Sequence, residues 1–162
     1  MVQGAPYPGI FQVAYVTRDM DAAQARFRET HGIGHFLDMR DMRYATRNGR
    51  MACSHVALAY SGAVEIELIQ PIDGDVEHYR QLLPEGGAVV RFHHLCRRFA
   101  NEEALDEQVR IYADQGRHFP ILADVEGFKY FYCDFVAELG HYVEGIFFRE
   151  QSLEWLASIP RF

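Results

Sequence analysis

Four polar residues could hold a divalent metal ion between two similar halves of this sequence. Gln12 lies midway along an apolar, alternating segment, and Glu67 lies within the last such segment of the same half. His94 and Glu144 hold the corresponding places in the second half. Two carboxylates, an imidazole and an amide oxygen suit an ion such as Zn, Ni, Co, Mn or Fe(II). Such an ion can stabilise an oxyanion, and a carboxylate beside it can move a proton.

Taken singly, each of these residues has an ordinary structural explanation. A glutamine on a strand is usually hydrogen-bonded, a strand carboxylate usually faces solvent, and a lone histidine is usually packed. The recurrence of the same two places in both halves is what favours a shared metal site.

An internal repeat relates the two halves. Residues 10–36 align with residues 92–119, so that Gln12 falls on His94. Each copy reads as a strand, a helix that ends near glycine, and three further strands, because apolar alternation and turn residues recur in that order. The element order is therefore β-α-β-β-β twice.

Hydrophobic patterning predicts the bounds of these elements. We expect strands at 10–17, 34–39, 52–60, 63–70, 91–98, 117–123, 128–135 and 141–148, and a turn at Asn48-Gly49. Asp19 and Asn101 are expected to begin the two helices. The linker at about 71–90 holds a short helix, and a last helix lies at about 150–160.

The fold class is α+β, with both modules in one domain of residues 1–162. Module one covers about 8–70 and module two about 91–148. Neither copy is large enough to bury both faces of a sheet alone. We therefore expect a shared curved sheet with helices outside and a concave cleft that binds a ligand.

Strand alternation predicts which side chains share the cleft. Phe92, His94 and Cys96 fall on one face, which leaves His93 on the other. Glu65 shares a face with Glu67, and we expect it at the rim or in solvent.

Candidate substrate contacts are weaker predictions. Tyr142, Phe119 and Phe131 could line an aromatic pocket, although strand aromatics are more often core residues. Arg43 belongs to an arginine-rich segment that could bind a carboxylate or a CoA-like phosphate, or could be a solvated hairpin.

Composition excludes several classes of protein. The net charge of -7 argues against nucleic-acid binding and against an anionic membrane surface, because both require a basic face. No apolar run is long enough for a membrane span, and the first residues lack the pattern of a signal peptide. The three cysteines are far apart and read as reduced, packed thiols, so we expect a cytoplasmic protein.

The chain resembles the vicinal oxygen chelate superfamily, which includes glyoxalase I, methylmalonyl-CoA epimerase, extradiol dioxygenases and bleomycin resistance proteins. The resemblance rests on FQVAYVTRDMDAA near the start, VEIELIQP at 64–71, FHHLC at 92–96 and LGHYVEGIFF at 139–148. It implies two βαβββ modules around a divalent metal held by Gln12, Glu67, His94 and Glu144. It also implies a homodimer and a small-molecule substrate.

The ligand types resemble one branch of the family most closely. A Gln, Glu, His and Glu set is similar to that of zinc-type glyoxalase I, whereas extradiol dioxygenases use two histidines and one glutamate. The resemblance implies an isomerase, epimerase or lyase that acts on adjacent oxygens through an enolate or enediolate. Glu144 is the first candidate for the base and Glu67 the second. The alternatives are a non-catalytic protein that sequesters a ligand and an Fe(II) extradiol dioxygenase.

Overall fold

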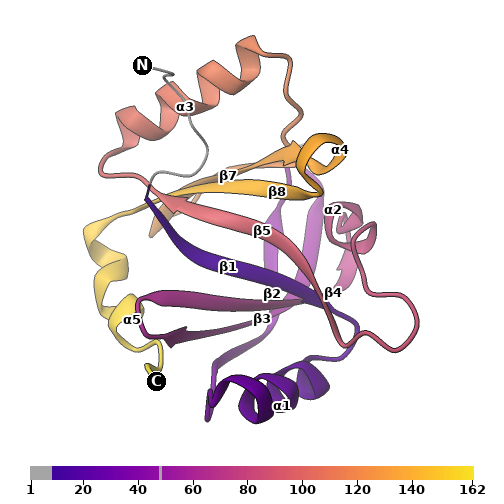
Figure 1. The fold of residues 1–162 in the computed structure, drawn as a ribbon. Coiled ribbons are helices and arrows are strands. Elements are labelled where there is room, and N and C mark those ends of the chain that lie inside the picture. Colours follow the sequence, from indigo (N-terminus) through magenta and orange to yellow (C-terminus); the bar gives the residue numbers. More distant parts are fainter. Residues whose placement is uncertain (1–8, 48) are drawn as a thin grey trace.

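Eight strands form one curved sheet in the computed structural model, which describes residues 9–47 and 49–162 (Figure 1). The strands of the first module are β1 (Ile10–Thr17), β2 (Leu37–Ala45), β3 (Met51–Ser61) and β4 (Val64–Gly74). Those of the second module are β5 (Val90–Arg98), β6 (Ile121–Asp124), β7 (Phe128–Phe135) and β8 (His141–Phe148). The predicted α+β class and the two βαβββ modules are confirmed.

The strand order brings the first and last strands of both modules to the middle of the sheet. That order is β2-β3-β4-β1-β5-β8-β7-β6. β1 and β5 pair antiparallel and join the modules, while β4 lies parallel beside β1 and β8 lies parallel beside β5. Side chains from four strands can therefore meet at the centre of one face.

One long helix from each module packs on the outside of the sheet (Figure 1). α1 (Met20–His31) begins where the Asp19 side chain accepts a hydrogen bond from the backbone N–H of Ala22. α3 (Glu102–Asp114) begins in the same way, with Asn101 accepting from Ala104. An oxygen-bearing residue at this position satisfies an N–H that the first helical turn leaves unpaired.

The apolar core has two outer parts and one inner part. Phe27 of α1 packs with Leu68 beneath the first module, and Leu105 of α3 packs with Phe131 beneath the second. The inner cluster combines residues of both modules and of the linker: Ala14, Val16, Ala52, Ile69, Val76, Tyr79, Ile121, Tyr132 and Tyr142. The modules therefore share the core on the concave face, as expected from their size.

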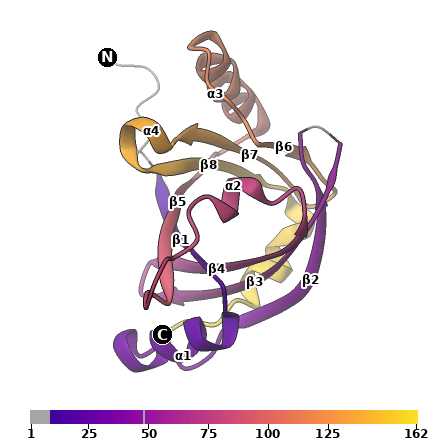
Figure 2. The ribbon, with the colours of Figure 1, turned by 90° about the vertical axis from the view of Figure 1, so that its right-hand side faces the viewer.

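The linker covers this concave face. Its short helix α2 (Glu77–Arg80) lies inside the curve of the sheet (Figure 2). Tyr79 is buried there, and its hydroxyl donates a hydrogen bond to the Tyr132 hydroxyl at 3.1 Å. The cleft expected from the sequence is thus partly filled by the protein's own linker.

Several boundaries differ from the sequence prediction. β2 extends to Ala45, β4 continues to Gly74 and β6 begins only at Ile121. Asn48 of the expected turn lies outside the described residues. The C-terminal helix consists of a 3-10 turn, η1 (Glu150–Ser152), followed by α5 (Leu153–Ala157).

An additional short helix, α4 (Val136–Leu139), joins β7 to β8. The carboxylate of Asp134 accepts a hydrogen bond from the Val136 N–H at its start. It ends at Gly140 with φ 77°, a left-handed conformation that glycine adopts without steric cost.

Within the described part of the chain, no helix has the length and hydropathy needed to cross a bilayer.

Candidate metal centre

The structure brings the four predicted metal ligands together on the concave face. Nε2 of His94 lies 3.3 Å from Oε1 of Gln12, on the neighbouring strand β1. The same nitrogen lies 3.2 Å from Oε2 of Glu67 on β4 and 2.9 Å from Oε2 of Glu144 on β8. One imidazole nitrogen therefore faces three oxygens that come from both modules.

Burial makes the electrostatics of this group strong. The side chain of His94 is fully enclosed, that of Glu144 is 7% exposed, and that of Glu67 keeps 13% exposure. Burial raises the pKa of Glu67, against the stabilising influence of His94. Burial also opposes the charged form of His94, but Glu144 and Glu67 together raise its pKa to about 9.

The donors fit a divalent cation. Among the described residues, Glu67, His94 and Glu144 offer ligand atoms that all lie within 4.8 Å of one another. Ligands bound to one ion at about 2.1 Å are separated by about 3 to 4 Å, so small side-chain movements suffice. Nε2 of His94 can carry only one hydrogen, which Glu144 is placed to accept. Buried Oε2 of Glu67 then has no hydrogen-bond donor among the described residues. A doubly positive ion would satisfy that oxygen and balance both carboxylates.

Glu65 is buried rather than solvated at the rim. It is 2% exposed, and its Oε1 accepts a hydrogen bond of 2.7 Å from Nε2 of Gln12. Burial raises the pKa of Glu65 to about 7, partly offset by hydrogen bonds from Tyr60 and Gln12. Because the Gln12 amide nitrogen is bound to Glu65, its oxygen points toward His94.

The prediction that His93 lies on the opposite face from His94 is wrong. Ala14 pairs with His94, but Tyr15 pairs with Phe92, so β5 carries one extra residue at His93. Such a bulge interrupts alternation and redirects side chains. His93 therefore points into the inner face and Phe92 packs on the outer face, where its ring meets that of Tyr15.

Tyrosines that the sequence did not single out surround the site. Tyr79 and Tyr132 are buried beside it, and Tyr44 and Tyr130 are half-buried on β2 and β7. Burial is the main cause that raises the pKa of Tyr44 to about 12, and it also raises that of Tyr130, with Glu67 adding to both. These hydroxyls are neutral at physiological pH and can donate hydrogen bonds. In the sequence, only the clustering of aromatic residues on predicted strands indicated that tyrosines could lie at the site.

Of the four predicted substrate contacts, only Tyr142 lies on the inner face, where its ring stacks on His93 with centroids 4.9 Å apart. Phe119 and Phe131 are buried in the outer core beneath α3. Phe131 lies there because it alternates with Tyr132, which faces inward. Arg43 is exposed on the outer side of β2, since it alternates with the inward-facing Tyr44.

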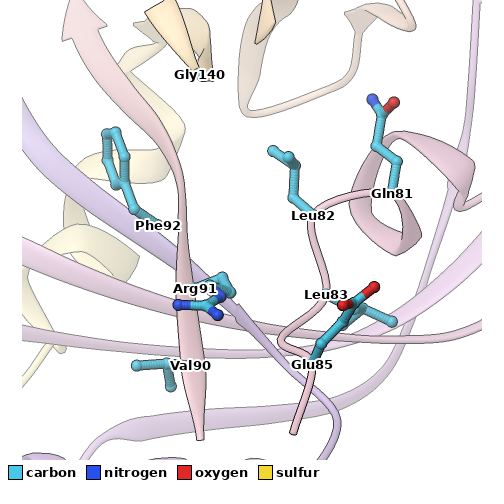
Figure 3. Close-up of a pocket in the computed structure, with 8 residues that line it drawn as sticks. All are labelled: Gln81, Leu82, Leu83, Glu85, Val90, Arg91, Phe92 and Gly140. Carbon is cyan, nitrogen blue, oxygen red and sulfur yellow. The ribbon is translucent and has the colours of Figure 1, made fainter. Parts of the chain in front are cut away.

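Two surface pockets flank the linker instead of opening onto the four ligands. One, of about 490 Å³, lies between linker residues 81–85 and the start of β5 (Figure 3). The other, of about 310 Å³, includes His78 and Tyr142 among its lining residues. Neither pocket has Gln12, Glu67, His94 or Glu144 among its lining residues.

Comparisons with known proteins agree with this architecture. Residues 11–129 match the sequence profile described as the Glyoxalase/Bleomycin resistance protein/Dioxygenase superfamily, whereas no curated protein sequence matches significantly. The methylmalonyl-CoA epimerase of Mycobacterium tuberculosis is similar in structure, with a TM-score of 0.56 and 15% identity over 93% of this chain and 95% of that chain.

Two further solved structures are similar to a comparable degree. A variant of the Streptomyces coelicolor methylmalonyl-CoA epimerase, in complex with 2-nitronate-propionyl-CoA, gives a TM-score of 0.55 and 16% identity over 85% and 95% of the two chains. A hypothetical protein from Bacillus halodurans gives a TM-score of 0.59 and 13% identity over 88% and 95%. At such identities the likeness concerns the fold.

Proposed function

The chain belongs to the Glyoxalase/Bleomycin resistance protein/Dioxygenase superfamily, and from this membership we propose that it is a metal-dependent isomerase, epimerase or lyase. The observation that carries the proposal is the convergence of two buried carboxylates on one imidazole nitrogen. The substrate class is a small molecule with adjacent oxygens and an acidic C–H beside a carbonyl.

The metal would be held by Gln12 Oε1, Glu67, His94 Nε2 and Glu144. When bound, a divalent ion supplies positive charge that stabilises the oxyanion formed as the substrate loses its proton. Zn, Ni, Co, Mn and Fe(II) all suit this mixture of nitrogen and oxygen donors.

The two carboxylates suit a proton transfer from two directions. Glu67 comes from β4 and Glu144 from β8, on opposite sides of the central pair of strands. One carboxylate can remove the proton from carbon, and the other, in its protonated form, can return a proton to the opposite face. We propose Glu144 and Glu67 for these roles. Burial raises the pKa of Glu67, and a higher pKa makes that carboxylate a stronger proton acceptor.

Neutral phenols complete the proposed site. Tyr44 and Tyr130 are both partly exposed, and the charge of Glu67 contributes to raising the pKa of each hydroxyl. Their hydroxyls can donate hydrogen bonds to substrate oxygens without adding charge. Tyr142 is proposed as a contact at the linker side, where its hydroxyl accepts a hydrogen bond from Gln81.

Deuterium exchange tests the proposal directly. Protein loaded with Zn²⁺ or Co²⁺ is incubated in D₂O with a panel that includes methylmalonyl-CoA and hemithioacetals of 2-oxoaldehydes. NMR then follows the C–H next to the carbonyl. We expect exchange with at least one compound, its loss in chelator, and its loss in Glu144→Gln and Glu67→Gln.

The exposed Glu154→Gln is the matched control and should retain exchange. Absence of exchange throughout the panel, or full exchange in both site variants, would contradict the proposal. Ligand binding that persists in chelator without turnover would favour sequestration. Fe(II)-dependent oxygen uptake with catechols would favour a dioxygenase.

Assembly and location are also proposed. We infer a homodimer in the cytoplasm, on the family resemblance and on three cysteines that are all free and buried. Sedimentation equilibrium tests the first part, since a monomer at micromolar concentration would contradict it. Fractionation of the source cells tests the second.

A further inference from the structure

A bulge places a second buried histidine directly behind the proposed metal ligand. The extra residue of β5 turns His93 inward, where its Nδ1 lies 2.8 Å from Nδ1 of His94. His94 therefore presents Nε2 to the carboxylates and Nδ1 to His93. The two rings are nearly perpendicular, with centroids 5.1 Å apart.

The far side of His93 determines where its hydrogen lies. Its Nε2 is 3.0 Å from the backbone oxygen of His78 in α2. A carbonyl oxygen only accepts, so Nε2 of His93 carries the hydrogen. A neutral imidazole has one N–H, so Nδ1 of His93 accepts and Nδ1 of His94 donates. In its neutral form, as a metal ligand, His94 then has Nε2 as the atom that can offer a lone pair on the carboxylate side.

The surroundings of His93 keep its ring neutral and in one orientation. Its contacts are aromatic rings, those of Tyr79, Tyr132, Tyr142 and His94, at centroid distances of 4.8 to 5.8 Å. The residue is completely buried among these rings, where a charged form is costly. A rotated ring would lose both hydrogen bonds.

We propose that His93 is a positioning residue that fixes the tautomer of His94, so that Nε2 of His94 binds the metal, and that the linker carbonyl of His78 fixes His93 in turn. This inference rests on the proposed metal site. Ligating histidines generally donate their other ring N–H to a nearby acceptor, and such acceptors affect metal affinity by about 10 to 100-fold. Here the acceptor is an imidazole that is itself held by the linker between the modules.

Two substitutions separate this role from simple packing. His93→Asn carries an amide oxygen near the position of Nδ1 and can accept from His94. His93→Phe fills the same space with a ring that cannot accept. Zn²⁺ affinity is measured by competition with a chromogenic chelator. We expect His93→Phe to bind about 10 to 100-fold more weakly than the native protein, and His93→Asn to stay within about threefold.

A measurement on the metal-free native protein tests the direction of the hydrogen bond between His94 and His93 without any metal. One-bond ¹H–¹⁵N couplings in ¹⁵N-histidine protein assign each imidazole hydrogen to a nitrogen. We expect the hydrogen between the two rings on Nδ1 of His94, and a hydrogen on Nε2 of His93. A shared hydrogen bonded to His93 would overturn the inference, as would equal Zn²⁺ affinity in His93→Phe.

These results distinguish the inference from the proposed function. Failure of the native protein to bind Zn²⁺, Co²⁺ or Mn²⁺ would contradict the metal site, whatever the couplings show. Equal weakening in His93→Asn and His93→Phe would show that His93 acts by packing alone and would overturn its positioning role. If His93→Phe fails to fold, the couplings and His93→Asn still decide the matter.

Discussion

The two modules place their candidate ligands at the same points of the fold but orient them differently. In module one, Gln12 pairs in register with Glu65, which binds its amide nitrogen. In module two, His94 pairs in register with Tyr142. Tyr142 precedes Glu144 by two residues, just as Glu65 precedes Glu67. Tyr142 instead stacks on His93, and His93 bonds to His94.

The difference follows from the shapes of the two ligands. An amide carries its oxygen and nitrogen at one end, so an acceptor on the neighbouring strand can turn the oxygen toward the site. An imidazole has its nitrogens on different sides of the ring, and its second nitrogen reaches a residue of its own strand. The bulge in β5 supplies that residue. The repeat therefore preserves positions, while the support of each ligand depends on its chemistry.

Loss of either carboxylate should have the largest effect. Glu67→Ala and Glu144→Ala each remove a ligand of one shared ion, so we expect each to weaken Zn²⁺ binding by more than about 100-fold, beyond what supporting residues cause. Chelator competition measures both. A large effect from only one module would show that the ion is not shared.

Removal of the support in module one should have an intermediate effect. Glu65→Leu leaves the Gln12 amide free to turn, and we expect about a 10-fold loss in Zn²⁺ affinity. Glu65→Gln keeps an acceptor and serves as the matched control, with a loss of less than about threefold. Equal affinities in all three proteins would mean that Gln12 does not depend on Glu65.

The linker between the modules should make stability depend on pH. Burial lowers the pKa of His78 from 6.5 to about 4. The nearby His94 adds to this lowering, whereas the charge of Asp75 opposes it. Since the unfolded state binds the proton more tightly, stability is complete above pH 6.5 and falls as the pH drops toward 4. The His78 ring alone is expected to contribute a loss of about 2 kcal/mol between pH 7 and pH 5, while Glu65, whose pKa is raised to about 7, contributes in the opposite direction.

Urea unfolding of the native protein and of His78→Leu at both pH values isolates this contribution. His78→Leu removes the titrating ring but keeps the backbone carbonyl that binds His93. The variant should lose about 2 kcal/mol less than the native protein over the same interval. Parallel pH profiles for the two proteins would contradict the assignment.

The helix caps offer the smallest and most symmetrical comparison. Asp19→Ala and Asn101→Ala each remove the oxygen that accepts from the third helical residue. We expect each to lower the free energy of unfolding by about 1 kcal/mol, measured in urea. Asp19→Asn keeps the acceptor and should lose less. Clearly unequal losses would mean that one helix contributes more to its module.

The sequence by itself determined the repeat and the fold class and pointed to the four candidate ligands. Apolar alternation is local, and recurrence at Gln12, Glu67, His94 and Glu144 distinguished them from ordinary strand residues. Only the tertiary structure decided the roles of their neighbours. A one-residue bulge reverses the direction of His93, and no propensity marks it. Glu65 is buried because its strand, β4, lies between β1 and β3 and because Gln12 donates a hydrogen bond to it. The linker fills the cleft because the hydroxyl of Tyr79 donates a hydrogen bond to that of Tyr132. Such contacts depend on residues far apart in the chain, which local patterns do not encode.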